Sequence, residues 1–309
     1  MNRRNFLKYS SLSGLVFSSP GMTYHWVKNA FVHDPEITRI TILHTNDVHS
    51  RVEAFPNDGS RNAGLGGASK RAALIAKLRR ENTNVLLLDA GDIFQGTPYF
   101  NFFGGEIEMK LMSEMGYDAA TIGNHDFDNG IAGLEKQLVH ANFPLLNVNY
   151  DFSDTVMNGK TKEYIIKSFE GIKIGIFGVG IELQGLVPSE LYKQTIYLDP
   201  IQAAQKTIDF LKNEESCDYV ICLSHLGYRY RDNTVSDVVL ARNTRDLDLI
   251  IGGHTHTFMS EPELIINRTG EKVVINQVGW AGIMLGRLDV TFEKNTRGKC
   301  IYCSNTFIK

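Results

Sequence analysis

Short polar clusters recur along this chain, and each directly follows a run of apolar residues that is typical of a β-strand. The clusters are Asp47-Val48-His49, Gly91-Asp92, Gly123-Asn124-His125-Asp126, Ser224-His225 and Gly252-Gly253-His254-Thr255-His256. Parallel strands end at the same edge of a sheet, so their terminal side chains can meet although they lie far apart in sequence. Because the clusters carry carboxylate, imidazole and amide groups, the pattern predicts one or two metal ions at the strand ends.

The spacing of the apolar runs predicts strands that alternate with helices. We expect strands over 37–46, 84–90, 118–122, 144–149, 164–169, 172–179, 218–224, 247–252, 262–267, 272–278 and 284–293. We expect helices over 68–80, 105–115, 130–141, 200–213 and 234–242. Repeated β-α-β units followed by a strand-rich tail indicate an α/β fold with four layers, an α-β-β-α sandwich. In this fold two mixed sheets are flanked by helices, and it forms one domain over 37–309.

The composition is that of a globular protein with enough apolar residues for a large core. Of the 309 residues, 43% are hydrophobic, and the net charge is −3. Because there is no basic stripe, binding of nucleic acid through charge is not expected. Cys300 and Cys303 have a spacing that redox and zinc sites use, but they stand without a second pair, and their role stays open.

The amino terminus has the features of an export signal. The run Asn2-Arg3-Arg4-Asn5-Phe6-Leu7-Lys8 precedes a short, weakly apolar stretch, and together they resemble a twin-arginine signal. We therefore expect residues 1–36 to be a signal and spacer, and the protein to be exported to the periplasm. No Ala-x-Ala cleavage site is evident, so an ordinary basic terminus is the alternative. No segment has the length of a membrane-spanning helix.

The polar clusters offer the ligands that hydrolysis of a phosphate ester needs. Two divalent ions about 3.5–4 Å apart can neutralise phosphoryl oxygens and lower the pKa of a bridging water. Ions this close repel each other and need a bridging carboxylate. Asp47 and His49 lie two residues apart after a strand, so both can turn toward one ion, and the same holds for His254 and His256. Asp92 follows a glycine, which gives the backbone freedom to bring its carboxylate close.

These clusters resemble, in order and spacing, the motifs of the calcineurin-like metallophosphoesterases, which are Asp-x-His, Gly-Asp, Gly-Asn-His-Asp, His and Gly-His-x-His. More detailed similarity is to the 5′-nucleotidase branch. It lies in the runs Ile42-Leu43-His44-Thr45-Asn46-Asp47-Val48-His49, Gly91-Asp92-Ile93-Phe94-Gln95-Gly96-Thr97-Pro98 and Gly123-Asn124-His125-Asp126-Phe127-Asp128. The resemblance covers about residues 37–295.

The resemblance implies two divalent metal ions and names their ligands. The implied ligands are Asp47, His49, Asp92, Asn124, His225, His254 and His256. The first ion would take Asp47, His49 and His256, the second would take Asn124, His225 and His254, and Asp92 would bridge both. Some nucleotidases of this branch have glutamine where His256 stands. The mixture of carboxylate, imidazole and amide suits zinc, manganese or iron and does not choose among them.

The resemblance also implies a catalytic pair that does not bind metal. His125 would stand beside the bound phosphate, stabilise charge or protonate the leaving oxygen, and be oriented by Asp128 three residues later. A carboxylate on one ring nitrogen raises the pKa of an imidazole and favours the form that donates a proton. Asp126 is the weaker candidate, because its position acts in support in the family.

We therefore expect a dinuclear metal-dependent phosphoester hydrolase. It would release phosphate from nucleoside 5′-monophosphates or related nucleotides by in-line attack of a metal-bridging hydroxide. One alternative is a phosphodiesterase acting on cyclic nucleotides or nucleotide sugars, and another is a thiosulfohydrolase, which shares the fold. A module that only binds metal is a further alternative, against which the pairing of His125 with Asp128 argues.

The two-domain 5′-nucleotidases place substrate recognition in a carboxy-terminal domain. Aromatic residues of that domain stack on the base, and its arginines hold the phosphate. The 309 residues of this chain leave no room for it after the catalytic motifs. A separately encoded partner that supplies this domain is therefore a hypothesis, and the small phosphorylated substrate itself is not identified by the sequence.

Overall fold

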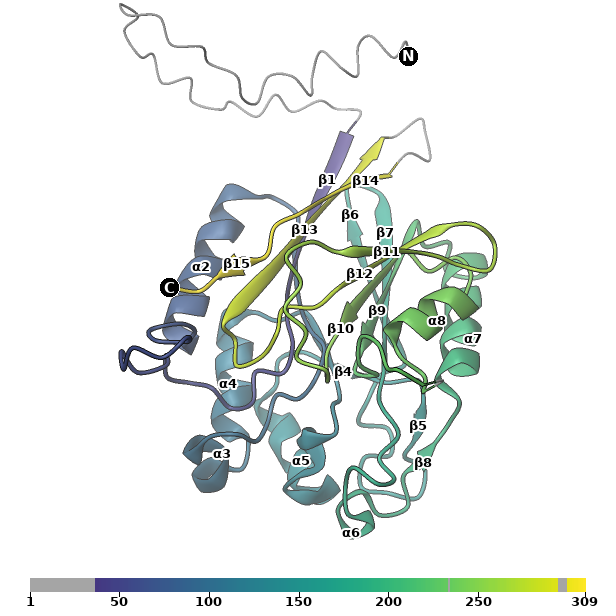
Figure 1. The fold of residues 1–309 in the computed structure, drawn as a ribbon. Coiled ribbons are helices and arrows are strands. Elements are labelled where there is room, and N and C mark those ends of the chain that lie inside the picture. Colours follow the sequence, from purple (N-terminus) through teal and green to yellow (C-terminus); the bar gives the residue numbers. More distant parts are fainter. Residues whose placement is uncertain (1–36, 233, 294–298) are drawn as a thin grey trace, which may run out of the picture. The chain divides into compact units, whose positions relative to one another are not determined.

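The computed structural model describes residues 37–232, 234–293 and 299–309. The export signal expected over residues 1–36 lies outside this part of the chain. Figure 1 shows two β-sheets whose outer sides are covered by helices. The expected mixed sheets flanked by helices are thereby confirmed.

The first sheet contains the amino-terminal strands. Its order is β14-β13-β1-β2-β3-β4, and β15 also pairs with β13. The bounds are β1 (Ile37–Thr45), β2 (Val85–Asp89), β3 (Ala119–Thr121), β4 (Leu145–Leu146), β13 (Met284–Glu293), β14 (Lys299–Cys303) and β15 (Thr306–Phe307). Strands β1 to β4 are parallel, whereas β13 is antiparallel to β1 and β14 to β13. The carboxyl ends of four strands therefore lie at one edge of this sheet.

The second sheet has the order β11-β12-β10-β9-β7-β6. Its bounds are β6 (Tyr164–Phe169), β7 (Ile172–Val179), β9 (Tyr219–Ser224), β10 (Leu249–Gly252), β11 (Glu263–Ile266) and β12 (Lys272–Asn276). The four central strands are parallel, and the two edge strands β6 and β11 are antiparallel to their neighbours. A small antiparallel pair, β5 (Tyr150–Asp151) and β8 (Ile196–Tyr197), lies apart from both sheets.

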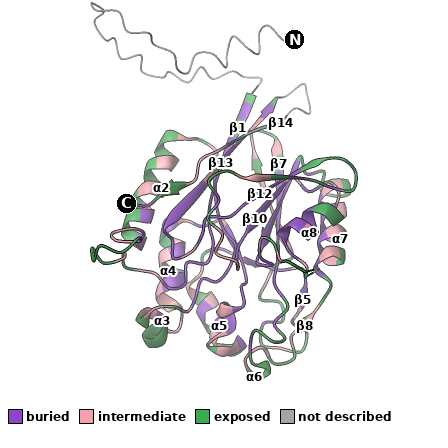
Figure 2. Ribbon diagram, in the orientation of Figure 1, coloured by how far each residue is buried: buried purple, intermediate pink, exposed green. Residues whose placement is uncertain are grey.

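The layers follow from the alternation of side chains along the strands. In β2, Leu86 and Leu88 belong to a buried cluster that also contains Ile221 of the second sheet. Leu87 belongs instead to the cluster that contains Met109 of a covering helix. Successive residues of a strand point to opposite faces, so each sheet is buried on both sides. Figure 2 shows the result, with central strands buried and helices exposed on their outer faces.

Helices cover both sheets, and two of them begin where a side chain caps the helix. α2 (Ala68–Glu81), α4 (Glu106–Met115) and α5 (Gly130–Gln137) pack against the first sheet. α7 (Pro200–Asn213) and α8 (Asp237–Asn243) pack against the second. The Asp199 carboxylate accepts hydrogen bonds from the first N–H groups of α7, and the Ser236 hydroxyl does so for α8. The expected helix over 234–242 therefore begins three residues later.

Other differences from the expected elements concern short segments. The helix expected over 130–141 ends at Gln137 and continues as a 3₁₀ turn, η2 (Leu138–His140). The strand expected over 144–149 is reduced to β4. Two short helices, α3 (Pro98–Phe103) and α6 (Ser189–Tyr192), were not predicted, and neither were β5 and β8. Segments this short carry little periodicity of their own and depend on tertiary contacts.

Candidate metal centre

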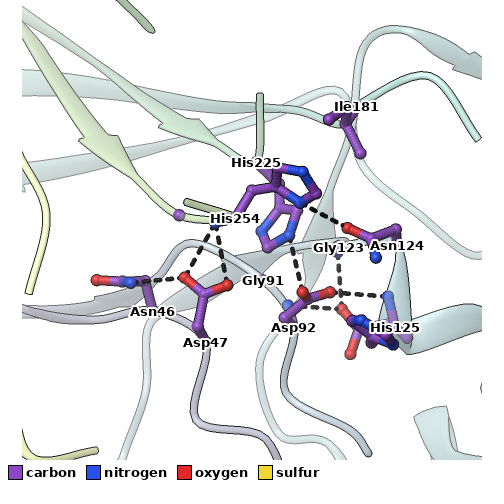
Figure 3. Close-up of polar contacts among 12 residues, drawn as sticks. Asn46, Asp47, Gly91, Asp92, Gly123, Asn124, His125, Ile181, His225 and His254 are labelled. Atoms are coloured by element: carbon purple, nitrogen blue, oxygen red, sulfur yellow. Dashed lines mark hydrogen bonds and ion pairs between the residues drawn. The ribbon is translucent and has the colours of Figure 1, made fainter. Parts of the chain in front are cut away.

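All the polar clusters predicted from sequence lie where the two sheets end. Asp47 and His49 follow β1, and Asp92 follows β2. Asn124 and His125 lie just beyond β3, and His125 begins the 3₁₀ turn η1 (His125–Phe127). From the second sheet, His225 directly follows β9, while His254 and His256 follow β10. Figure 3 shows the side chains of both sheets meeting in one place.

The ligand loops have an unusual backbone conformation. The residues with positive φ include Asp47 (50°), His49 (50°), Asp92 (55°), His254 (69°) and His256 (51°). A residue other than glycine in this left-handed backbone region destabilises the fold by roughly 1–3 kcal/mol, and such backbone strain concentrates at functional sites. Five of the seven predicted ligands therefore occupy positions where the fold accepts a conformational cost.

Glycines let the loops approach each other closely. A Cβ atom on Gly123 would lie 2.1 Å from Asp92 Oδ1, and one on Gly253 would lie 2.8 Å from the carbonyl oxygen of Ala90. A Cβ atom on Gly91 would lie 2.7 Å from the backbone nitrogen of Gly123. No side chain fits at these positions without displacing a ligand loop.

The first group of ligands consists of Asp47, His49 and His256, whose ligand atoms lie within 4.8 Å of one another. His256 Nε2 lies 3.3 Å from Asp47 Oδ1 and 3.0 Å from His49 Nε2. Two imidazole nitrogens and a carboxylate oxygen at these distances suit one divalent ion, which prefers this mixture of ligands.

The second group consists of Asp92, His225 and His254, again within 4.8 Å. His225 Nε2 lies 3.1 Å from Asp92 Oδ2, and His254 Nδ1 lies 2.8 Å from Asn124 Oδ1. The same oxygen of Asp92 lies 3.8 Å from His49 Nε2 of the first group. Asp92 is therefore placed between the two groups, as the sequence predicts for a bridging ligand. The structure thus brings all seven predicted ligands together.

Hydrogen bonds orient the ligand histidines. His225 Nδ1 donates to the carbonyl oxygen of Ala90 at 2.7 Å, and His49 Nδ1 faces the carbonyl oxygen of Phe94 at 3.2 Å. This leaves Nε2 of each ring toward the centre, the arrangement that metal-binding histidines use. His225 Nε2 is buried and makes no hydrogen bond within the described part of the chain. A buried nitrogen without a hydrogen-bond partner, beside a carboxylate, fits a metal ligand.

The protonation states of His49 and His254 suit metal binding, whereas His225 keeps a proton beside Asp92 until an ion is bound. Burial lowers the pKa of His254 to about 4 and lowers the pKa of His49, so both rings are neutral. Burial alone would raise the pKa of Asp92, but the charge of His225 holds it well below its usual range. Burial opposes a charge on His225 as well, yet Asp92 and its neighbours raise that pKa to about 10. A metal ion bound beside Asp92 would replace this proton.

His125 and Asp128 form the pair that the sequence predicts. His125 Nδ1 lies 2.8 Å from Asp128 Oδ2, and the side chain of His125 is 39% exposed. The hydrogen bond to Asp128 is the main reason that the pKa of His125 is raised. The backbone N–H of His125 donates to Asp92 Oδ1 at 2.8 Å. The ring thus stands beside the ligands, accessible to solvent and oriented by a carboxylate, and Figure 3 shows its link to Asp92.

Asp126 contributes more than its sequence position suggests. Its carboxylate accepts hydrogen bonds from the backbone N–H groups of Asp92, Ile93, Phe94 and Gly123. These bonds fix the loop that carries Asp92 against the loop that carries Asn124. Asp126 is buried, so it acts on the centre through these loops and not by contact with a substrate.

Two further residues position the ligand loops, one inside a recognised motif and one outside any motif. Asn46 Nδ2 donates to Asp47 Oδ2 and to the carbonyl oxygen of Gly279, each at 2.6 Å. Gln277 Nε2 donates to the carbonyl oxygen of Gly253 at 2.6 Å. Asn46 stands within a recognised run, but Gln277 is a single glutamine after β12, and only the folded chain shows its role.

The arrangement is an α/β fold with two adjacent groups of candidate metal ligands at the strand ends. Residues 40–258 match the calcineurin-like phosphoesterase family. The chain belongs to this family, as the motifs predict.

Its relatives include nucleotidases. The chain is 35% identical to a snake venom 5′-nucleotidase of Gloydius brevicauda over 82% of this chain and 45% of that protein. It is 32% identical to the trifunctional nucleotide phosphoesterase protein YfkN of Bacillus subtilis, over 82% of this chain and 18% of that protein. The crystal structure of a 5′-nucleotidase precursor from Thermus thermophilus superposes with a TM-score of 0.79 at 30% identity, covering 87% of this chain and 54% of that one. The chain thus spans about half the length of the venom enzyme it matches.

Replacing Asp126 by Asn should lower metal affinity about 10- to 100-fold, because the amide nitrogen cannot accept the two backbone N–H groups that one carboxylate oxygen of Asp126 holds. Calorimetric titration of metal-free protein with Zn²⁺ or Mn²⁺ measures the change. Asp154, which is exposed, provides a matched control as Asp154→Asn. An unchanged affinity in Asp126→Asn would show that the loops keep their places without this carboxylate.

Proposed function

We propose that this protein is a dinuclear metal-dependent phosphoester hydrolase that releases phosphate from nucleoside 5′-monophosphates. The observation that carries the proposal is the pair of adjacent ligand groups, with Asp92 Oδ2 of the second group 3.8 Å from His49 Nε2 of the first, in a chain of the calcineurin-like phosphoesterase family. The nucleotide specificity is supported by the names of its relatives, the venom 5′-nucleotidase among them.

We assign the first ion to Asp47, His49 and His256, and the second to Asn124, His225 and His254, with Asp92 shared by both. Two divalent ions bound there would neutralise phosphoryl oxygens and lower the pKa of a water molecule. Zinc, manganese and iron all suit these ligands.

His125 then serves the leaving group. Its ring adjoins the first ligand group, with its centroid 5.3 Å from that of His49. Nδ1 is held by Asp128, so Nε2 is the atom free to hold a proton for the departing oxygen or to donate a hydrogen bond to a phosphoryl oxygen. Asp128 keeps the ring in one orientation and favours its protonated form.

Export is part of the proposal. The paired arginines Arg3 and Arg4 and the weakly apolar residues after them support a twin-arginine signal and a periplasmic location. No helix in the described part of the chain combines the length and apolar character needed to cross a membrane.

The venom 5′-nucleotidase is longer than the part of it that matches this chain, and recognition of the nucleotide is proposed to need a further domain. The chain matches 45% of the venom enzyme, and the proposal includes a separately encoded domain that completes the recognition of the nucleotide. The second candidate is a phosphodiesterase acting on cyclic nucleotides or nucleotide sugars, since the name of YfkN describes a trifunctional nucleotide phosphoesterase and so indicates that relatives can act on more than one nucleotide ester. A thiosulfohydrolase activity and a module that only binds metal stay as alternatives that the following assay separates.

A substrate panel tests the function directly. With metals loaded, the purified protein should release phosphate from AMP faster than it hydrolyses 2′,3′-cyclic AMP, UDP-glucose, bis-p-nitrophenyl phosphate or an S-sulfonated thiol. A chelator should abolish activity, and added Zn²⁺ or Mn²⁺ should restore it. Asp92→Asn serves as the inactive control, because it removes the shared negative charge. Full activity on AMP without a second subunit would refute the partner, and no turnover at all with metals bound would favour the binding module.

His125→Asn should leave both ions bound and lower turnover of AMP by roughly 10²- to 10⁴-fold, the scale of a general acid–base group. Metal content is measured by elemental analysis beside the kinetics. His140→Asn is the matched control, because His140 lies in η2, outside the ligand loops, and its Nε2 lies 3.9 Å from Glu106 Oε2. Turnover equal to the unmodified protein would mean that the role of His125 is misassigned.

The export signal is tested by replacing Arg3 and Arg4 with lysine in the full chain. Expressed in a bacterium with a twin-arginine pathway, the double variant should stay in the cytoplasm, because the pathway reads paired arginines. Fractionation and immunoblotting measure the distribution. Arg61→Lys provides the control, and periplasmic accumulation of the double variant would count against a twin-arginine signal.

A further inference from the structure

His256 differs from the other ligand histidines in how it is held. Its side chain is 40% exposed, whereas that of His225 is fully buried and that of His49 is 8% exposed. Carbonyl oxygens face the outer nitrogens of His49 and His225. For Nδ1 of His256, the ring nitrogen that does not face Asp47 and His49, no described residue provides a hydrogen-bond acceptor. An exposed side chain can adopt several rotamers, and fixing one of them for metal binding costs conformational entropy.

An indole ring covers His256 instead. The ring of Trp280 lies parallel to the imidazole, with 8° between the planes and 5.8 Å between the centroids. Offset stacking of this kind is an energetically favourable arrangement of aromatic rings. The indole therefore restricts the orientation of His256 from one face of its ring, while Asp47 and His49 contact Nε2 at the ring edge.

Trp280 is itself fixed from two directions. The ring of Phe55 packs edge-on against it, with centroids 5.9 Å apart at 77°. Both aromatic rings pack on a small buried cluster that includes Val278 and Ile283. The indole is thus a supported surface and not a freely moving side chain.

The backbone beside Trp280 is bonded to both loops of the first ligand group. The N–H of Ala281 donates to the carbonyl oxygen of Asp47 at 2.7 Å, and the N–H of Gly279 donates to that of Thr257 at 2.9 Å. Segment 279–281 therefore joins the loop after β1 to the loop after β10. The position of the indole relative to Asp47 and His256 is set by these bonds.

We propose that Trp280 is the positioning residue for His256, so that aromatic stacking does for this ligand what a hydrogen bond does for His49 and His225. The inference rests on the proposed two-metal function and goes beyond it in predicting unequal effects on the two ions. Loss of the indole weakens the ion held by Asp47, His49 and His256. The ion held by Asn124, His225 and His254 keeps its affinity, because Trp280 contacts none of these residues.

The test compares Trp280→Leu with Trp280→Phe in the full chain. Calorimetric titration of metal-free protein with Zn²⁺ should show two sites in the unmodified protein. Trp280→Leu should bind one ion about tenfold more weakly and the other unchanged, the lower end of the effect of losing an orienting partner. Trp280→Phe, which keeps a ring for stacking, should restore most of the affinity. Phe102→Leu, at a position 81% exposed on α3, is the control.

Fluorescence gives a second readout that does not depend on activity. The chain has two tryptophans, and the other one, Trp26, can be replaced by Phe so that Trp280 alone emits. Emission should change as the ion at His256 binds, and should saturate with that ion.

Two results overturn the inference. Trp280→Leu that binds both ions with unmodified affinity would show that His256 needs no stacking partner. Equal weakening of both ions, with a lower melting temperature, would show that Trp280 acts only on the fold. Failure of the proposed function is distinguishable from either, because the unmodified protein would then bind no pair of ions.

Discussion

The candidate centre depends on the buried, ionised carboxylate of Asp92, which lies between histidines of both sheets. One of its oxygens lies 3.1 Å from His225 of the second sheet and 3.8 Å from His49 of the first. A buried negative charge is unfavourable unless positive or donor groups surround it. Here the imidazole of His225 and the N–H of His125 do so, and two divalent ions would do so more completely. The two sheets thus meet around one charge.

The surrounding structure holds this charge in place through the backbone. Asp126 accepts four N–H groups from the loops after β2 and β3. On the opposite side, Asn46 and Gln277 bond the loops after β1 and β10 to the chain beyond β12. The strain in the ligand loops can persist because these bonds fix each loop more than once. The rigidity of the centre is therefore a property of both sheets together.

Much of the fold was predictable because long elements carry their own periodicity and caps. The helix over 200–213 and the hairpin strands over 164–169 and 172–179 have the expected bounds, since Asp199 and the turn at Gly171 mark their ends. Short elements such as α3 and β5 were missed, because a few residues show no period and fold only against neighbours. Helix α8 begins three residues later than expected because the cap at Ser236, and not the apolar pattern, decides where the helix begins.

The sequence by itself determined which side chains could serve as ligands and in what order the strands present them, because each motif directly follows an apolar run. It also supplied the pair His125 and Asp128, which are near in sequence and so near in space. Only the tertiary structure decided that Gln277 and Trp280 belong to the centre. These residues belong to no local sequence pattern. Their contacts with Gly253 and His256 form because the chain after β12 and the chain after β10, which are far apart in sequence, lie together in the folded protein.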